Sequence, residues 1–472
     1  MVQEITSEQN ASILPEDLAQ WTQDLEARLD RVQQHPEQGL GFIEEQVRQC
    51  TLELQRKVVE RAMQAKADAV DECCSCCQTP LIERKRRVPK TIHSFCGPVR
   101  LFRTHGWCRK CEQWVFPADA ALGLFDDSTA SPLVQEMCAL LVSKMPCEQA
   151  EPVAQRVAGI HLSRCTMARE AQRQGERAIQ MRQEQTRAPL AGPPPSALAV
   201  AGLDQPPKPF TMVIEIDAWN IRERDDWGKT QAKLKRGEKI ERWHWVYTAT
   251  CFRLEQRVRK GKRRAVILDR SYVATRQGIE PMMKQLHREA MRRGLAQAKE
   301  VLVIADGAVW IWNAAEDRFS EAVQRLDLFH ANAYLWAVAN QIHGANTPAA
   351  RQWVKPLLKQ IKTDQVARVI HTLEELKPTL SAASAKVTVT TIDYYRSNEK
   401  RMKYVAGKKR GEPVGSGAIE STCRQLQCRM KRCGQFWTTQ GDEPLLCLEV
   451  FWRNDHWELL FPHLSITSLS NN

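Results

Sequence analysis

The sequence predicts a multidomain α+β protein, and three observations indicate this class. The chain has 472 residues, which is too long for one hydrophobic core and suggests about three domains. Two Cys-x-x-Cys pairs, near residues 75 and 110, mark a small unit stabilised by metal. After a proline-rich stretch, apolar runs with β-type alternation give way to segments with helical periodicity.

Composition and periodicity divide the chain into seven segments. Residues 14–70 show helical spacing of apolar side chains, and residues 188–210 contain too much proline for a helix. We expect a helical segment at 1–70, a zinc ribbon at 71–130, a helical region at 131–187, a proline-rich linker at 188–210, the core of an α/β domain at 211–344, a helical insertion at 345–412 and the C-terminal part of that domain at 413–472.

The charge balance favours a polyanionic partner. The chain carries 68 Lys and Arg against 56 Asp and Glu, a net charge of +12, and nucleic acid is the usual partner of such a protein. No apolar run approaches the roughly 18 residues of a membrane span, and the N-terminus lacks the pattern of a signal peptide. We therefore expect a cytoplasmic protein with no membrane association.

The cysteine pairs predict a structural zinc site. Cys74, Cys77, Cys108 and Cys111 form two Cys-x-x-Cys pairs around a β-like segment with a Gly-Pro turn. Cys73 and Cys76 have the same spacing and remain an alternative for the first pair. Four thiolate ligands leave no open position on zinc, so the site would stabilise the fold.

Residues 147–171 have the layout of a helix-turn-helix. A helical run ends at Gly159, and Ser163 is a candidate N-cap for a second helix. That helix would present Arg164, Arg169 and Arg173 to a DNA major groove. A helical hairpin within a bundle would have the same pattern, so this alternative stays open.

The order of elements after the linker predicts an RNase H-like catalytic core. Three adjacent strands, of the kind that pair antiparallel, precede alternating helices and strands that are added by crossovers. The expected elements are strands 211–217, 242–253 and 265–273, helix 278–297, and strands 301–305 and 323–328.

Three carboxylates are candidate ligands for magnesium ions in this core. Asp217 ends the first expected strand, Asp306 comes at the end of the fourth, and Glu420 lies in the first turn of a helix expected at 416–432. If the two strands are neighbours, the aspartates lie close together, and carboxylates are ligands that Mg²⁺ prefers. Each acid has a simpler role as a solvated charge, and Glu420 could merely complement its helix dipole.

The same helix region is basic beyond Glu420. Arg424 lies one turn further on, and Lys431 and Arg432 follow near the expected helix end. These side chains could contact DNA phosphates beside the metal ions. Tryptophans could in addition stack on unpaired bases, although core packing is their more ordinary role; the candidates are Trp243, Trp245, Trp310, Trp312 and Trp437.

Three motifs resemble the transposases of ISKra-type bacterial insertion sequences, which are Asp-Asp-Glu enzymes distantly similar to the Mutator superfamily. They are Asp306-Gly-Ala-Val-Trp-Ile-Trp-Asn, Leu326-Asp-Leu-Phe-His330-Ala-Asn-Ala-Tyr-Leu, and Gly415-Ser-Gly-Ala-Ile-Glu-Ser with the later Arg429-Met-Lys-Arg-Cys-Gly-Gln-Phe-Trp437. The resemblance extends from the cysteine pairs to the C-terminus. It implies catalytic roles for Asp217, Asp306 and Glu420, and it places the Asp327-x-x-His330 pair near the site.

The expected function is therefore DNA transposition. Such an enzyme cleaves at element ends and joins 3'-hydroxyls to target DNA, with two Mg²⁺ or Mn²⁺ ions, and holding two ends requires a dimer or larger assembly acting on double-stranded DNA in a bacterial nucleoid. Two alternatives stay open: a nuclease of the same fold, and an inactive zinc-containing DNA-binding protein derived from a transposase. The second is suggested by Ala218, since relatives usually have glycine after the first aspartate.

Overall fold

The computed structural model describes residues 15–124, 128–187, 209–224, 230–238, 242–260 and 264–462. The chain divides into two compact units, Met1–Gln174 and Gly175–Asn472. Helix α6 (Arg164–Arg187) contributes residues to both units. Residues 188–208 of the expected proline-rich linker lie outside the described residues. As expected, the described chain is mixed α+β, with helices and several sheets.

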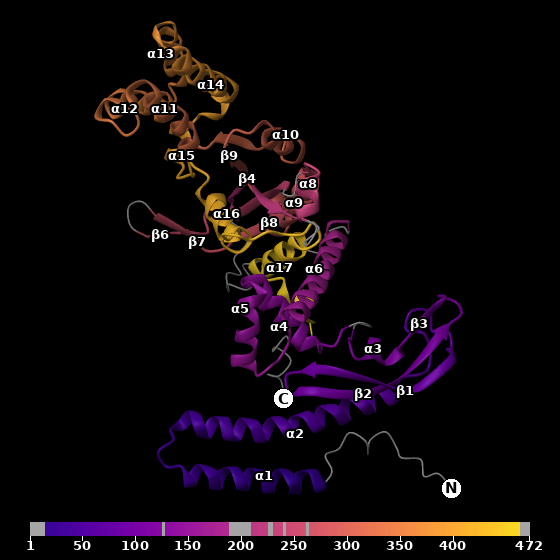
Figure 1. Cartoon of the computed structure of the whole chain (residues 1–472). Helices are drawn as coiled ribbons and strands as arrows, with labels where there is room; N and C mark the ends of the chain where they lie inside the picture. Colours follow the sequence, from indigo (N-terminus) through magenta and orange to yellow (C-terminus); the bar gives the residue numbers. More distant parts are fainter. Residues whose placement is uncertain are drawn as a thin grey trace. The chain divides into compact units, whose positions relative to one another are not determined.

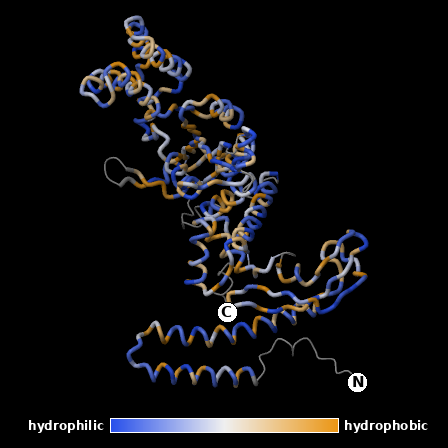
Figure 2. Tube along the Cα trace, viewed as in Figure 1, coloured by the Kyte–Doolittle hydropathy of each residue, from blue (hydrophilic) through white to orange (hydrophobic). Residues whose placement is uncertain are grey.

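The first unit begins with two helices, α1 (Pro15–Gln34) and α2 (Leu40–Asp68). Both alternate hydrophilic and hydrophobic residues along their length (Figure 2), as amphipathic helices do. Helix α2 packs on a three-stranded antiparallel sheet of β1 (Ile82–Ser94), β2 (Gly97–Cys108) and β3 (Gln113–Val115). The Gln64 side chain fixes this contact, because its amide donates to the Phe102 carbonyl at 2.8 Å and accepts from the Phe102 N–H at 2.9 Å.

The rest of the first unit is helical. It comprises α3 (Pro117–Ala121), α4 (Pro132–Lys144), α5 (Cys147–Val153), a π-helical turn (Ala154–Ala158) and the start of α6. Gly159 ends the π-helical turn with a φ of 67°, a left-handed conformation that suits glycine. Ser163 then caps α6, since its Oγ accepts from the Thr166 N–H at 3.2 Å. This is the expected succession of helix, glycine turn and capped helix.

A five-stranded sheet organises the second unit (Figure 1). Its strand order is β10-β9-β4-β5-β8. β4, β5 and β8 pair antiparallel, while β9 and β10 run parallel to β4. The bounds are Thr211–Glu223 (β4), Arg242–Arg253 (β5), Ser271–Thr275 (β8), Glu300–Ala305 (β9) and Val323–Leu326 (β10).

Each face of this sheet is apolar and is covered by helices. Met212, Ile214 and Ile216 of β4 pack in one core with helices α9, α10 and α11. Val213 points to the opposite face, where it packs near helix α16, and α17 lies along β8. The helices are α9 (Ile279–Arg292), α10 (Val309–Arg318), α11 (Leu328–His343), α16 (Gly417–Met430) and α17 (Asp442–Arg453).

Shorter elements connect these layers. The strand expected at 265–273 divides in two, because β7 (Arg264–Ile267) pairs with β6 (Arg257–Lys260) outside the main sheet. Between β7 and β8, Asp269 leaves the strand to pair with Arg293 at 2.7 Å. The remaining elements are α8 (Thr230–Lys235), α18 (Trp457–Leu460) and 3₁₀ turns at Leu295–Gln297, Lys377–Thr379 and Glu399–Arg401.

The expected helical insertion is present between β10 and α16. It consists of α12 (Pro348–Lys362), α13 (Val366–Leu376), α14 (Ala382–Asn398) and α15 (Val405–Lys409). α12 and α14 pack on α11. None of the helices in the described ranges is both long and apolar enough to cross a membrane.

Close packing at Gly175 gives a test of the second unit. A Cβ at this position of α6 would lie 2.5 Å from the Pro444 backbone oxygen, so Gly175→Ala should lower the melting temperature although alanine favours helices. Gly41→Ala in α2 is the matched control, because a Cβ there meets nothing within 4 Å. A Gly175→Ala variant as stable as the control would contradict this packing.

Candidate functional site

Four cysteines come together in the first unit. Cys74 and Cys77 precede β1, while Cys108 ends β2 and Cys111 lies in the following turn. All four sulfurs lie within 4.8 Å of one another, with Cys74 to Cys111 at 3.9 Å and Cys77 to Cys108 at 3.4 Å. A tetrahedral zinc ion with Zn–S bonds of about 2.3 Å requires sulfurs about 3.8 Å apart. The group could therefore bind zinc.

This geometry distinguishes the two possible first pairs. Cys74 is fully buried, whereas Cys76 is exposed and neither Cys73 nor Cys76 belongs to the cluster. The Thr79 hydroxyl lies 3.2 Å from Cys77 Sγ, and hydrogen bonding with Thr79 lowers the pKa of Cys77 to about 6. Hydrogen bonding with Cys77 raises the pKa of Cys111, so the cysteines share protons that a bound metal ion would displace.

In the second unit, sheet register brings Asp217 and Asp306 to the same level. The parallel pairing of β4 with β9 ends at Glu215 and Ile304, so residues 217 and 306 follow side by side. The prediction that Asp217 ends its strand is wrong. β4 continues to Glu223, because its antiparallel pairing with β5 extends beyond the end of β9. Asp306 directly follows β9, as expected.

Helix α16 packs on β4 and brings its own side chains to Asp217. Cys423, one turn beyond Glu420, has its Sγ 3.7 Å from Asp217 Oδ2. Glu420 also lies near His330, and one ligand atom from each of Asp327, His330 and Glu420 falls within 4.8 Å of the others. The structure therefore gathers the predicted residues Asp217, Asp306, Glu420 and His330 around one part of the sheet edge.

Asp327 holds this arrangement together. Its Oδ1 accepts from the backbone N–H groups of Phe329 and His330 and caps α11, while its Oδ2 accepts from both the N–H and the hydroxyl of Ser416. Asp327 is fully buried. Burial would raise its pKa, but the hydrogen bonds from His330 and Ser416 lower it to about 2. Both oxygens are thus occupied by protein donors, which makes Asp327 a structural anchor rather than an available ligand.

Gly415, the first glycine of the motif before Glu420, packs closely on α11. A Cβ at Gly415 would lie 2.6 Å from the Phe329 ring, so a larger residue would have to displace that ring next to the contact between Ser416 and Asp327.

Glu215 is a second anchor, which the sequence reasoning considered and set aside. It is 1% exposed, and its Oε2 accepts from the N–H of Ile419 at 2.8 Å. Burial raises its pKa to about 8, although hydrogen bonds from Ile419 and Ala418 oppose the shift. Glu215 thereby fixes the first turn of α16 to β4. An acid two residues before Asp217, on the same strand face, was the signal available in the sequence.

The helical insertion positions Asp306. Tyr394 of α14 donates its hydroxyl to the Asp306 carbonyl at 2.5 Å and stacks on Tyr334 of α11 at 3.8 Å between ring centroids. Gly307 follows with a φ of 101°, and a Cβ there would lie 2.8 Å from the Tyr394 ring. This turn therefore requires glycine.

The electrostatics of the gathered acids favour a cation. Burial and the nearby Asp306 raise the pKa of Asp217, although the Ala218 N–H donates to it at 2.7 Å. Within the described ranges, Asp217, Asp306 and Glu420 have no salt bridge to lysine or arginine. All three are partly exposed. His330 lies beside them with its Nδ1 3.5 Å from Asp327 Oδ1, and that contact raises the His330 pKa.

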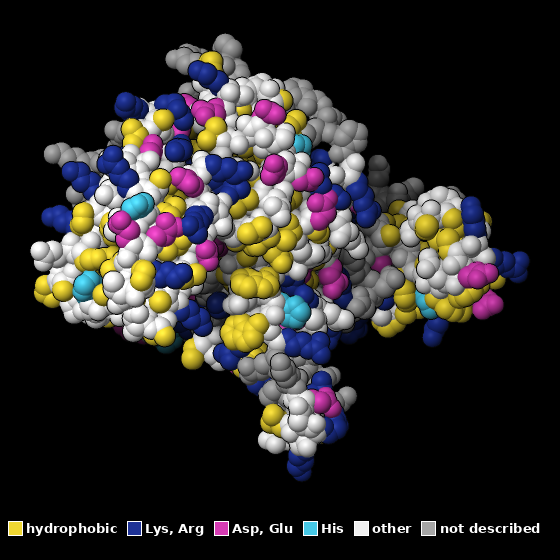
Figure 3. Space-filling model, turned by 90° about the horizontal axis from the view of Figure 1, so that it is seen from above, with side chains coloured by type: hydrophobic (Ala, Val, Ile, Leu, Met, Phe, Trp, Pro, Cys, Tyr) yellow, Lys and Arg dark blue, Asp and Glu magenta, His cyan; other side chains and the backbone are white. Residues whose placement is uncertain are grey.

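The predicted DNA-contacting residues lie in varied settings. Arg424 is exposed on α16, but the helix ends at Met430, so Lys431 and Arg432 follow it rather than continue its face. In the first unit, Arg169 is exposed and Arg164 bonds to Glu148 at 3.3 Å. Arg173 is mostly buried and paired with Glu170 at 2.7 Å. Figure 3 shows many further Lys and Arg side chains interspersed with acids on one face.

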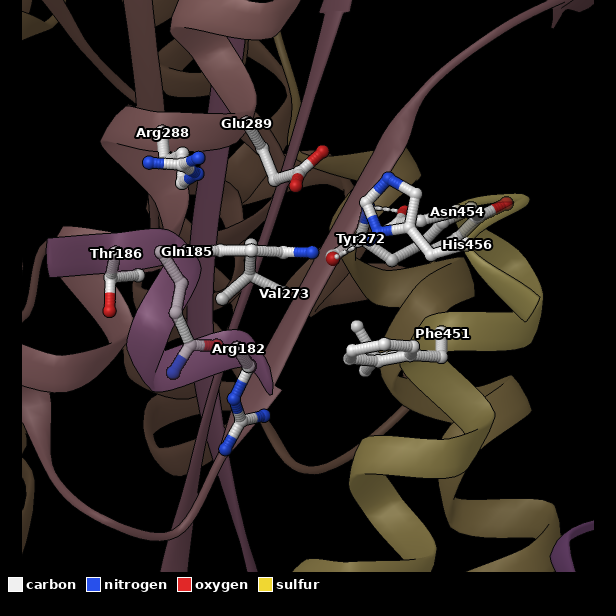
Figure 4. A pocket seen from close by; sticks show the side chains of 12 residues that line it. Arg182, Gln185, Thr186, Tyr272, Val273, Arg288, Glu289, Phe451, Asn454 and His456 are labelled. Carbon is white, nitrogen blue, oxygen red and sulfur yellow. Dashed lines mark hydrogen bonds between the residues drawn. The ribbon is translucent and has the colours of Figure 1, made fainter. Parts of the chain in front are cut away.

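A small cavity in the second unit involves none of the predicted site residues (Figure 4). It lies among α6, β8, α9 and α17, with Tyr272, Glu289 and Phe451 in its lining. Its volume of about 20 Å³ is enough for about one water molecule. The cavity is too small for a substrate.

No protein-family model matches the chain, and the search of curated proteins returned no relative.

Removal of zinc ligands tests the cysteine cluster. Cys108→Ser should abolish bound zinc, measured by elemental analysis of the purified protein, and should lower the melting temperature, since four thiolates hold a structural ion. The control is Cys76→Ser, which alters the exposed alternative cysteine and should retain one zinc per chain. Zinc loss in the control alone would reverse the assignment.

The lowered pKa of Asp327 predicts that the folded protein loses stability in acid. Its pKa lies below the ordinary value of 3.8, at about 2, so its stabilising effect is present above pH 3.8 and is lost as the pH falls toward 2. Asp327→Asn should reduce the free energy of unfolding at pH 7 by about 3 kcal/mol and flatten this acid limb. Denaturant titrations across pH, with the exposed Asp317→Asn as control, measure both effects.

Proposed function

We propose that the protein is a DNA transposase with an RNase H-like catalytic core. The observation that carries this proposal is the gathering of Asp217, Asp306 and Glu420 around His330. The three carboxylates are partly exposed, and none forms a salt bridge with a lysine or arginine among the described residues. The sheet order β10-β9-β4-β5-β8, in which β4, β5 and β8 are antiparallel and precede β9 and β10 along the chain, supports the fold assignment. The resemblance to ISKra-type transposases, carried by the motifs around these acids, supports the substrate.

The three carboxylates fit divalent metal ions. Oxygen ligands suit Mg²⁺ or Mn²⁺, and Asp217, Asp306 and Glu420 would hold them. Bound there, such ions activate a water or a 3'-hydroxyl and stabilise the leaving oxygen. The chain's own contribution is rigid placement: Glu215 and Asp327 fix the start of α16, and Tyr394 fixes the Asp306 turn.

His330 fits a role in binding the phosphodiester. Its side chain is 44% exposed and faces the carboxylates, and Asp327 favours its protonated form by raising its pKa. A cationic imidazole beside the acids would donate to a phosphate oxygen and orient the scissile strand. Arg424, exposed one turn beyond Glu420, would contact the backbone further along.

Zinc at the cysteine cluster would be structural, and the helical region of the first unit would contact DNA through Arg164 and Arg169 at its exposed surface. Arg173 would stabilise helix α6 through its ion pair with Glu170. Holding two element ends together requires at least a dimer in this proposal.

Ala218 does not weigh against activity. It lies within β4 opposite Tyr247 and has no left-handed backbone conformation. An alanine therefore fits this strand position without strain, and its N–H still donates to Asp217.

Loss of one carboxylate tests the proposal. Asp306→Asn should reduce Mg²⁺- or Mn²⁺-dependent cleavage of duplex DNA carrying the repeats that flank the gene by roughly two orders of magnitude or more. Asp317→Asn, which changes an exposed acid on α10, should cleave like the wild type. Equal cleavage by Asp306→Asn and the wild type would refute the assignment, and pre-cut ends that are never joined to target DNA would indicate a nuclease.

A further inference from the structure

The β4–β5 pair extends beyond the end of β9 and has two different faces. On one face Trp219, Ile221 and Glu223 are buried, and β4 contacts α16 and the segment around Trp437. On the other face the pairing places Trp243 opposite Arg222 and Trp245 opposite Asn220. Directly opposed residues of an antiparallel pair share a face, so both tryptophans project on the side away from α16.

These two tryptophans are unusually open. Trp243 is 57% exposed and Trp245 is 54% exposed. Trp219, Trp312 and Trp437, by contrast, are at most 8% exposed. The structure thus separates core tryptophans, the ordinary case, from a pair that no described element covers.

The exposed pair belongs to a row of rings on the sheet face opposite the Asp217 carboxylate. Alternate residues of a strand lie about 7 Å apart on one face, so Trp243, Trp245 and Tyr247 form a line. Tyr247 contacts Trp310 edge to face, with 5.3 Å between ring centroids. Tyr247 is opposite Ala218, whereas Asp217 lies on the other face, where it contacts Cys423 of α16.

A cation accompanies the outer end of the row. The Arg222 guanidinium lies 5.4 Å from the Trp243 ring centroid and 4.8 Å from that of Phe436. Exposed aromatic rings beside arginine are the recurring surface for unpaired nucleic-acid bases, which stack on the rings while cations attract the backbone. The rings lie about 7 Å apart along β5. This spacing suits the bases of an extended, unstacked DNA strand. The net charge of +12 agrees with such a ligand.

We propose that Trp243 and Trp245 form a stacking platform for unpaired bases of single-stranded DNA on the sheet face opposite the Asp217 carboxylate. This inference rests on the proposed function for the choice of DNA, and it specifies the form of one part of the substrate: a DNA segment separated from its duplex. Duplex DNA would not engage the platform, because its bases are already stacked and paired.

Binding without catalysis tests the platform. Fluorescence anisotropy of a labelled single-stranded oligonucleotide, measured without divalent ions, should show that Trp243→Ala and Trp245→Ala each weaken binding roughly ten-fold. Duplex binding should change less than about two-fold, and Trp243→Phe should retain most single-strand binding because a ring remains. The matched control is Trp114→Ala, which removes a tryptophan that is 46% exposed in the first unit.

A second measurement needs no variant. Photo-crosslinking of the wild-type protein to an oligonucleotide with 5-iodouracil, mapped by mass spectrometry, should label Trp243 or Trp245. Three results would each overturn the proposal. The alanine variants could lose single-strand and duplex binding equally, or they could bind single strands as the wild type does. The third result is that crosslinks are confined to other residues.

The outcome is separable from that of the catalytic proposal. Asp306→Asn should lose cleavage yet bind single strands like the wild type. A wild-type protein that never cleaves DNA, but prefers single strands in a way that depends on Trp243 and Trp245, would refute the transposase proposal and support the stacking platform. Cleavage without this preference for single strands would support the transposase proposal and refute the platform.

Discussion

The buried carboxylate of Asp327 is the interaction on which the site depends. It directly follows β10, caps α11 and accepts two hydrogen bonds from Ser416 at the start of α16. A buried charge is tolerated only when its hydrogen bonds are complete, and here the donors come from two elements that are far apart in sequence. The penalty for losing any donor therefore keeps α11 and α16 together, and with them His330 and Glu420.

Glu215 acts in the same way from the sheet. Its hydrogen bond to the first turn of α16 joins the strand that carries Asp217 to the helix that carries Glu420. Together with the bond from Tyr394 to the Asp306 carbonyl, it holds three acids near His330 with no salt bridge to lysine or arginine among the described residues. Such a cluster is unfavourable alone and is compensated by a bound cation. In our proposal this strain is the reason the site binds metal.

Much of the fold could be predicted from local patterns. Alternating apolar residues indicated β5 and β9 nearly to the residue, and glycine and serine signals indicated the start of α6. The division of 265–273 was not predictable, because the pairing of Asp269 with Arg293 depends on α9 packing against the sheet. The extension of β4 beyond Asp217 depends likewise on its partner, since β5 is longer than β9.

The sequence by itself determined the candidate residues: the cysteines by their spacing, Asp217 and Asp306 by their positions at the ends of apolar strands, and Glu420 by the motif before it. Spacing along the chain is a local property, and residue type sets what each side chain can bind. Only the tertiary structure decided which residues share a space. Asp327 proved to be an anchor because Ser416 reaches it, and Trp243 and Trp245 proved to be exposed on the part of the β4–β5 pair that extends beyond β9. Burial and hydrogen-bond partners arise from packing between distant segments, which no local pattern specifies.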